Sequence, residues 1–200
     1  MDRFAAKHDG VAPVAVVVDP IGTPSSNTLC MDTRLGQAET YLVDDAVPWI
    51  KEHLTVATDP QHWAAGGFSF GGTCAVQLLA KHPELFGSAL GFAAEKEPSL
   101  AKERRKTIDA AFGGDEAAFD ANIPAHFFAE GGHEGQFLFL AAGGRDTDFM
   151  AQADVIAAQA RGGGVQVQED FIPGEGHSWE MIARAIPTGL DALGDRWRLP

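Results

Sequence analysis

A serine flanked by glycines is the residue of this chain best placed to do chemistry. Ser69 lies at the centre of a Gly-x-Ser-x-Gly pentad, residues 67–71. This pattern is typical of a sharp strand-to-helix turn that holds a nucleophilic hydroxyl at the edge of a sheet. Glycine suits the positions two before and two after the serine, because it has no Cβ to clash in a tight turn. The alternative is a glycine turn in which Ser69 only caps the following helix.

A serine hydroxyl needs a histidine as its base, and that histidine needs an acid that fixes its tautomer and stabilises its cation. Asp146 and His177 follow Ser69 in the order Ser, Asp, His, which is one of the known orders for such a triad. Asp146 follows an apolar strand predicted over 136–142, and an acid just past a parallel strand faces the same sheet edge as Ser69. Asp148 is the alternative acid, and its structural role would be to cap the next helix. His177 lies in a glycine-rich loop after the last predicted strand, from which an imidazole reaches over that edge.

The backbone and the remaining histidines complete the candidate chemistry. The N–H of Phe70, which follows the nucleophile, is expected to donate to an oxyanion. The other histidines fit structural positions better, and they are His8, His53 and His82 on helix surfaces or ends, His62 before the serine strand, and His126 and His133 in a covering segment. A substrate contact stays open for the last two.

Composition limits the classes of function. Residues 1–200 suit a single domain with a substantial core. A net charge of −13 argues against nucleic acid and anionic membrane surfaces as partners. There is no apolar run of about 18 residues and no signal-peptide pattern at the N-terminus, so any membrane contact is expected through a segment outside this chain. Two cysteines are too few for a zinc site, and neither a metal nor another cofactor is expected.

Strands and helices alternate along the chain. Strands are predicted over 13–19, 62–65, 86–92, 136–142 and 165–172, and a loop over 20–34. Helices are predicted over 37–54 with a kink at Pro48, 73–82, 99–114, 148–161 and 178–193 with a break at Pro187, and a helical or irregular cover over 115–130 breaks near Pro124. This alternation predicts an α/β fold with a mostly parallel sheet flanked by helices on both faces.

Four motifs resemble the esterase branch of the α/β-hydrolases, which holds esterase D-type hydrolases and mycolyltransferases. They are residues 66–75, 82–86, 112–115 and 173–179. Residues 38–42 and 45–50 are similar to a subset whose hydrolase domain follows membrane-spanning helices. The resemblance runs from about residue 13 to 193. It implies the α/β-hydrolase fold, Ser69 as nucleophile, Asp146 as acid, His177 as base, and an extracytoplasmic or cell-envelope location.

The chain departs from that family pattern at its start. Family members carry three or more strands before the segment that begins here, and their second oxyanion donor lies in the loop after the third strand. The chain is therefore expected to lack the N-terminal strands, as the C-terminal part of a longer protein or as a truncated form. The Ser-Gly pair of the family is also absent, and residues 91–93 stand in its place. An unpaired strand edge would invite pairing of two copies, so a homodimer is one expectation.

Two classes of function stay open. The first is a serine hydrolase that cleaves carboxylic esters through an acyl-serine, with acyl transfer to a sugar hydroxyl as its variant. The second is a non-catalytic domain that acts as a binding module. The cysteines leave a similar choice, because Cys74 fits a small core residue, while a Cys30–Cys74 disulfide would fit an exported protein.

Overall fold

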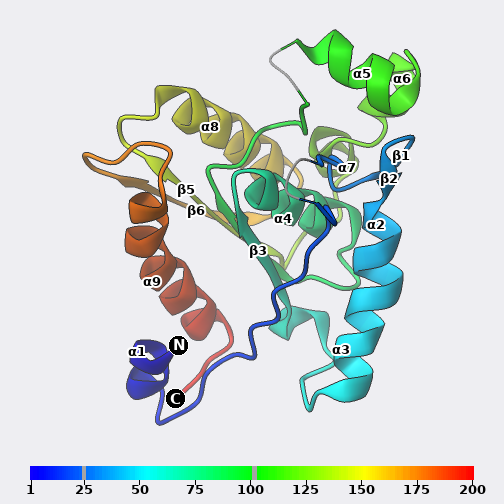
Figure 1. The fold of residues 1–200 in the computed structure, drawn as a ribbon. Coiled ribbons are helices and arrows are strands. Elements are labelled where there is room, and N and C mark those ends of the chain that lie inside the picture. The colour runs from blue at the N-terminus through cyan, green and yellow to red at the C-terminus, as the bar shows by residue number, and fades with distance from the viewer. Residues whose placement is uncertain (24–25, 101–102) are drawn as a thin grey trace.

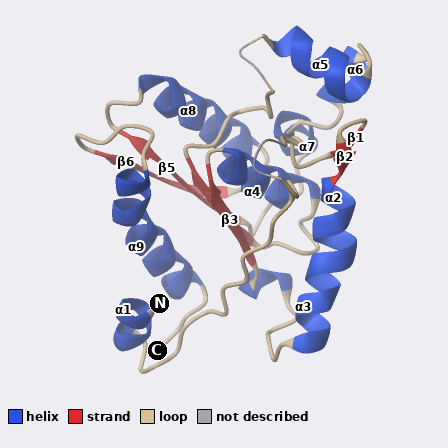
Figure 2. Cartoon of the chain, viewed as in Figure 1, coloured by secondary structure: helices blue, strands red, loops and turns tan. Residues whose placement is uncertain are grey.

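Four parallel strands form the central sheet, in the order β3-β4-β5-β6. The computed structural model describes residues 1–23, 26–100 and 103–200. The strands are β3 (Ala64–Phe68), β4 (Ser88–Phe92), β5 (Phe137–Gly143) and β6 (Gln166–Ile172). A helix lies between each strand and the next, so the predicted α/β fold is confirmed (Figures 1 and 2).

The helices and a small hairpin complete the described chain. The hairpin pairs β1 (Asp32–Thr33) with β2 (Gly36–Gln37). The α-helices are α1 (Asp2–Lys7), α2 (Ala38–Thr40), α3 (Val47–His53), α4 (Phe70–Lys81), α5 (Arg104–Phe112), α6 (Glu116–Asp120), α7 (Pro124–Glu130), α8 (Thr147–Gly162) and α9 (Trp179–Arg196). A π-helix (Tyr41–Ala46) joins α2 to α3, and a 3₁₀-helix (Pro60–His62) precedes β3.

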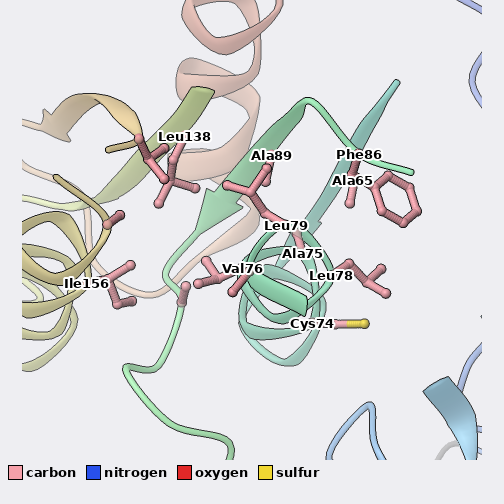
Figure 3. Packing of buried hydrophobic residues seen from close by; sticks show 14 of the residues in the cluster. Ala65, Cys74, Ala75, Val76, Leu78, Leu79, Phe86, Ala89, Leu138 and Ile156 are labelled. Carbon is pink, nitrogen blue, oxygen red and sulfur yellow. The ribbon is translucent and has the colours of Figure 1, made fainter. Parts of the chain in front are cut away.

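Alternation along the strands divides the core between the two faces of the sheet. Leu138 and Leu140 of β5 point to one face, where they pack with residues of α4 and α8. Figure 3 shows part of this layer, in which Val76 and Leu79 of α4 and Ile156 of α8 gather near Leu138. Since successive residues of a strand face opposite sides, Phe139 packs on the other face. The buried strand β5 therefore carries apolar residues on both sides, as a parallel strand does.

Helix α9 covers the second face of the sheet and runs through Pro187, where the sequence predicted a break. A proline inside a helix costs roughly 3 kcal/mol. Burial of Ala185 and Leu193, and the close approach of Gly189 to the Phe139 ring, offset that cost. Tertiary packing thus overrides the local preference, and α9 ends only at Arg196, near α1 and both termini (Figure 1).

The predicted strand over 13–19 was wrong. These residues are described without regular structure, and Val14 and Val17 are 58% and 97% exposed. Their backbone does not pair with β3; a cavity of about 690 Å³ lies between, lined by Val14 and Val16 on one side and Ala65 on the other. An apolar run predicts burial, but a strand also needs a hydrogen-bonded neighbour, and β3 is paired only with β4 among the described residues.

The other predicted helices and strands differ less from those in the structure. The irregularity predicted at Pro48 is a π-helix that ends just before it, and Pro48 lies in the first turn of α3, where its missing N–H costs nothing. The helix predicted from residue 99 begins at Arg104. Residues 101–102 of that prediction, and residues 24–25 of the predicted loop, lie outside the described residues. Within the described ranges, no helix is long and apolar enough to cross a membrane.

Candidate active site

Ser69 stands at the junction of β3 and α4 with a strained backbone. Its φ of 54° and ψ of −113° lie where few non-glycine residues are found. Its N–H donates to the Phe92 carbonyl oxygen at 2.8 Å, which ties the turn to the end of β4. Ser69 occupies the N-cap position of α4, yet its Oγ caps no backbone N–H in the described part of the chain. The alternative hypothesis, that the Ser69 side chain only caps helix α4, is therefore wrong.

The turn requires glycine at two positions, Gly67 and Gly72. The pentad pattern indicates Gly67 and Gly71 instead. A Cβ at Gly67 would lie 2.5 Å from the Gly71 carbonyl carbon, so this position requires glycine. A Cβ at Gly71 would meet no described atom within 4 Å. The next residue is the restricted one, because a Cβ at Gly72 would lie 2.6 Å from the Phe92 carbonyl oxygen. Helix α4 thus crosses β4 closely enough to exclude any side chain at Gly72.

Three side chains from distant parts of the chain meet at this turn. The Ser69 Oγ lies 3.0 Å from His177 Nε2, and His177 Nδ1 lies 3.2 Å from Asp146 Oδ2. Because an ionised carboxylate can only accept, Nδ1 carries the hydrogen and Nε2 is left to accept from the Ser69 hydroxyl. The arrangement has the hydrogen-bond order of a Ser-His-Asp triad.

The Asp146 carboxylate makes two contacts at once. Its Oδ2 faces His177, and its Oδ1 accepts from the Phe149 N–H at 3.4 Å, which makes Asp146 the N-cap of α8. The capping role weighed for Asp148 therefore falls to Asp146, and Asp148 lies in the first turn of α8. Because the cap fixes the carboxylate at the helix end, α8 orients the group that faces the imidazole.

Backbone contacts hold the His177 loop against the end of β5. The Arg145 N–H donates to the Glu175 carbonyl oxygen at 2.8 Å, and the Gly144 N–H donates to Ile172 at the same distance. A Cβ at Gly143 would lie 2.5 Å from the carbonyl oxygens of Glu175 and Gly176. The loops that carry Asp146 and His177 thus form one packed unit, which sets the distance between the two side chains.

Two phenylalanines that the sequence analysis did not single out flank the imidazole. The Phe68 ring lies 4.6 Å from the His177 ring, and the Phe149 ring lies 4.5 Å from it, between centroids. Phe68 lies in the pentad itself, and Phe149 follows the acid by three residues. Because each phenylalanine lies so close in sequence to a candidate site residue, the sequence alone could have indicated that both rings lie near the site. They limit the rotation of the His177 ring.

The N-terminus of α4 adjoins Ser69. The Phe70 N–H is the first of the helix and makes no hydrogen bond with the described chain. Helix N-termini carry a partial positive charge, which favours an anion there. The Phe70 N–H therefore stays a candidate donor to an oxyanion beside Ser69.

Comparison with known proteins shows the family to which the chain belongs. Residues 2–183 match the family model described as "Putative esterase". The chain belongs to this esterase family. It is also 34% identical over 206 residues to an uncharacterized protein of Corynebacterium glutamicum, a match that covers 98% of this chain and 47% of that protein. The chain thus spans about half the length of the curated relative that it matches.

Solved structures share the fold of this esterase-family chain. An S-formylglutathione hydrolase of Agrobacterium tumefaciens aligns with a TM-score of 0.71 and 19% identity, over 86% of this chain and 64% of that one. The fluorophosphonate-binding serine hydrolase FphF of Staphylococcus aureus aligns with a TM-score of 0.71 and 14% identity, over 96% and 74%. At these identities the likeness shows the fold, which is that of the α/β-hydrolases.

A polar cavity of about 180 Å³ opens beside the turn at Ser69. It is lined by Ser69 and Phe70 and by the polar side chains of Asn27, Thr73, Gln77, Glu95 and Ser99. We call it the polar cavity. Glu95 was missed in the sequence, although it follows the carboxyl end of β4 by three residues, as Asp146 follows β5. The rule that selected Asp146 would have selected Glu95 too.

Two histidines outside the candidate site, His133 and His82, are held by contacts with neighbouring residues. His133, for which a substrate contact was open, is buried; its Nδ1 lies 2.7 Å from Gln136 Oε1 and its Nε2 lies 3.0 Å from the Phe127 carbonyl oxygen. His82 Nε2 lies 2.9 Å from Glu39 Oε1. The hydrogen bond with Glu39 raises the pKa of His82 despite partial burial. Among the described residues, no group of three or more histidine, cysteine or acidic side chains is placed to hold a metal.

Cys30 and Cys74 form a disulfide that joins the loop before β1 to α4, with 5.4 Å between their Cα atoms. Both residues are buried. Since Cys74 lies one turn beyond Ser69 on the same helix, the bond fixes the loop of Asn27 and Leu29 beside the polar cavity.

Proposed function

We propose that this domain is a serine esterase, which hydrolyses carboxylic esters through an acyl-serine intermediate. The observation that carries the proposal is the chain of contacts from Ser69 Oγ to His177 Nε2, and from His177 Nδ1 to Asp146 Oδ2, at 3.0 and 3.2 Å. Membership of the esterase family supports it.

Ser69 would act as nucleophile on the ester carbonyl. As its Oγ bonds to the carbonyl carbon, His177 Nε2 takes the hydroxyl proton, and Asp146 stabilises the imidazolium. The carbonyl oxygen becomes an oxyanion, which the Phe70 N–H and the N-terminus of α4 would stabilise. His177 then returns the proton to the departing alkoxide, and the carbon–oxygen bond of the ester breaks.

The acyl-serine would be resolved by water. His177 takes a proton from the water as its oxygen attacks the acyl carbon, and gives that proton to Ser69 Oγ as the acyl bond breaks. The free acid leaves and the hydroxyl is restored. The same steps with a sugar hydroxyl in place of water would give acyl transfer.

Turnover of short p-nitrophenyl esters tests the proposal. We expect slow hydrolysis by the parent chain and loss of most of the enzymatic rate, to a similar extent, in Ser69→Ala and His177→Ala, because the two residues act as a unit. Exposed residues of the same types give matched controls, and Ser26→Ala and His62→Ala should keep the parent rate. Equal rates in the parent and in Ser69→Ala would exclude the proposal.

A further inference from the structure

The polar cavity lies next to Ser69 and is bounded by α4, by the segment after β4 and by the loop before β1. Thr73 joins two of these elements, because its hydroxyl donates to the Ser69 carbonyl oxygen at 3.1 Å and accepts from the Glu95 N–H at 2.9 Å. This contact sets the position of Glu95 relative to the nucleophile. Glu95 and Ser69 line the same cavity, and this contact keeps their backbones at a fixed separation.

The two hydroxyl donors of Thr73 and Ser99 and one hydrogen of the Asn27 amide are already used, while the Phe70 N–H of the cavity has no partner among the described residues. The Asn27 amide donates to the Ser99 carbonyl oxygen at 3.0 Å. The Ser99 hydroxyl donates to the Glu95 carboxylate, with its Oγ 3.0 and 3.1 Å from the two oxygens. The Thr73 hydroxyl donates to Ser69. The Thr73 and Ser99 hydroxyls therefore have no hydrogen left for a ligand, and the Asn27 amide keeps one of its two.

The acceptors are not all used. Gln77 is 1% exposed, and its Nε2 donates to the Leu29 carbonyl oxygen at 2.9 Å. That contact fixes the orientation of the amide, since a carbonyl oxygen can only accept. The Gln77 Oε1 is buried and has no hydrogen-bond partner among the described residues. The Glu95 carboxylate has lone pairs beyond those that face Ser99. A buried acceptor without a partner costs free energy, and a ligand that donates would remove that cost.

Burial has an electrostatic consequence at Glu95. It raises the pKa of this carboxyl, while hydrogen bonds from Ser99 act in the opposite direction. Desolvation also strengthens the attraction between the carboxylate and a donor or cation placed beside it.

The position of His177 decides which part of an ester would enter. The departing alcohol receives its proton from His177 Nε2, so it lies on the His177 side of Ser69. His177 does not line the polar cavity, whereas Ser69 and Phe70 do. Because Ser69 and Phe70 line the cavity, an acyl group bonded to Ser69 Oγ can extend into it. The cavity volume of about 180 Å³ is below the roughly 300–1,000 Å³ of drug-sized ligand sites, which suits a short acyl chain.

We propose that the polar cavity binds a short acyl group that carries a hydrogen-bond donor, either an ammonium or a hydroxyl, and that Glu95 is the residue that selects it. This inference rests on the proposed function of Ser69.

Three p-nitrophenyl esters of equal acyl length test the selection: the butanoate, the 3-hydroxypropanoate and the 3-aminopropanoate. The rate of Ser69→Ala is subtracted for each ester. We expect kcat/KM of at least one donor-bearing ester to exceed that of the butanoate by about tenfold or more, since hydrogen bonds to a charged group are the strong ones. Preference for the ammonium ester alone assigns the effect to charge, and preference for both assigns it to hydrogen bonding.

Glu95→Gln keeps the size of the side chain and removes its charge. We expect it to lower the ratio of kcat/KM for the ammonium ester to kcat/KM for the butanoate about tenfold or more. The corresponding ratio for the hydroxyl ester should fall less, because the amide oxygen still accepts a hydrogen bond. Comparing ratios between proteins cancels the different intrinsic reactivities of the esters. Glu97→Gln is the matched control, since Glu97 is in the same segment but accepts from Arg104 Nε at 3.2 Å. An unchanged ratio in Glu95→Gln, or an equal change in Glu97→Gln, overturns the inference.

Binding separates this inference from the function on which it rests. Without turnover that depends on Ser69, the proposed function fails. The selection is then measured in the folded Ser69→Ala protein, as the Kd of methyl 3-aminopropanoate, methyl 3-hydroxypropanoate and methyl butanoate by NMR titration. Tighter binding of a donor-bearing ester, lost on adding Glu95→Gln, supports the inference, and equal binding of all three contradicts it.

Discussion

The Asp146 carboxylate faces His177 Nδ1 at 3.2 Å with one oxygen and caps helix α8 with the other. An acid that is also an N-cap has its orientation set by the helix, so the imidazole that it contacts is oriented in turn. This relationship distinguishes Asp146 from Asp148, two residues later, and it makes the choice of acid open to experiment.

Asp146→Asn is expected to lower kcat on a p-nitrophenyl ester by about 10⁴, because an amide can offer its N–H to His177 Nδ1 and favour the wrong tautomer. Asparagine is also a good N-cap, so the melting temperature should change little. Asp148→Asn is the control, and its kcat should stay within about threefold of the parent value. A larger loss in Asp148→Asn than in Asp146→Asn would assign the acid to Asp148.

The glycines after Ser69 should differ in their tolerance of alanine. Gly72→Ala puts a Cβ 2.6 Å from the Phe92 carbonyl oxygen and is expected to destabilise the fold by about 1–3 kcal/mol. Gly71→Ala meets no described atom and should stabilise it by up to about 1 kcal/mol through helix propensity. Urea unfolding of the two variants measures both effects. The reverse order of stability would contradict the turn geometry.

The contact between the Asp146 and His177 loops gives a third prediction. Gly143→Ala places a Cβ 2.5 Å from two carbonyl oxygens of the His177 loop, so that loop must shift. We expect kcat/KM to fall about tenfold or more, since small misplacements of catalytic groups are costly. Gly162→Ala, near the end of α8 and with no described atom in reach of the Cβ, should keep the parent kcat/KM. Equal activity of the two variants would show that the close contact is not needed.

The pair of His82 and Glu39 should make stability depend on pH. The hydrogen bond with Glu39 raises the pKa of His82. Burial alone would raise the pKa of Glu39, but hydrogen bonds from His82 and Lys81 lower it, so Glu39 stays ionised near neutral pH. A raised histidine pKa contributes stability that is complete below about pH 6.5 and is lost as the pH rises through the folded-state pKa.

His82→Gln should therefore lower the melting temperature more at pH 6 than at pH 9. The expected difference is about 1 kcal/mol, which corresponds to roughly 2–4 °C in a chain of this size. Thermal unfolding by circular dichroism at both pH values measures it, with the exposed His62→Gln as control. A larger loss of melting temperature in His82→Gln at pH 9 than at pH 6 would contradict a raised pKa of His82.

The disulfide should contribute to stability through the 44 residues that separate Cys30 from Cys74. Loop-closure entropy predicts about 4 kcal/mol, and measured contributions are typically about 2–4 kcal/mol. Cys30→Ala together with Cys74→Ala should lower the melting temperature by roughly 4–16 °C. A reductant should lower it in the parent chain and leave the double variant unchanged. Equal melting temperatures of the parent with and without reductant would contradict the bond.

Local patterns predicted the parts of the fold that depend on local physics. The pentad around Ser69 and the apolar run of β5 predicted the turn and the central strand, because both are specified by neighbouring residues. The order of acid and base along the chain selected Asp146 and His177 as candidates, and the structure places them within hydrogen-bond distance of each other and of Ser69.

Features that depend on distant residues were less predictable. The apolar run at residues 13–19 predicted a strand. A strand also needs a hydrogen-bonded neighbour, and the composition of a segment does not show whether one is present. Helix α9 continues through Pro187 because Gly189 and Leu193 pack against the sheet. The restriction at Gly72 comes from Phe92, twenty residues later, and the capping by Asp146 depends on where α8 begins. Each of these follows from packing between segments far apart in the sequence.

Covalent labelling with a fluorophosphonate is the most direct test of the central claim, that Ser69 is a nucleophile activated by His177. The account predicts one label per chain, found on the peptide that contains Ser69, with labelling lost in Ser69→Ala and strongly slowed in His177→Ala. Folded parent protein that remains unlabelled, or that is labelled equally in Ser69→Ala, would contradict it.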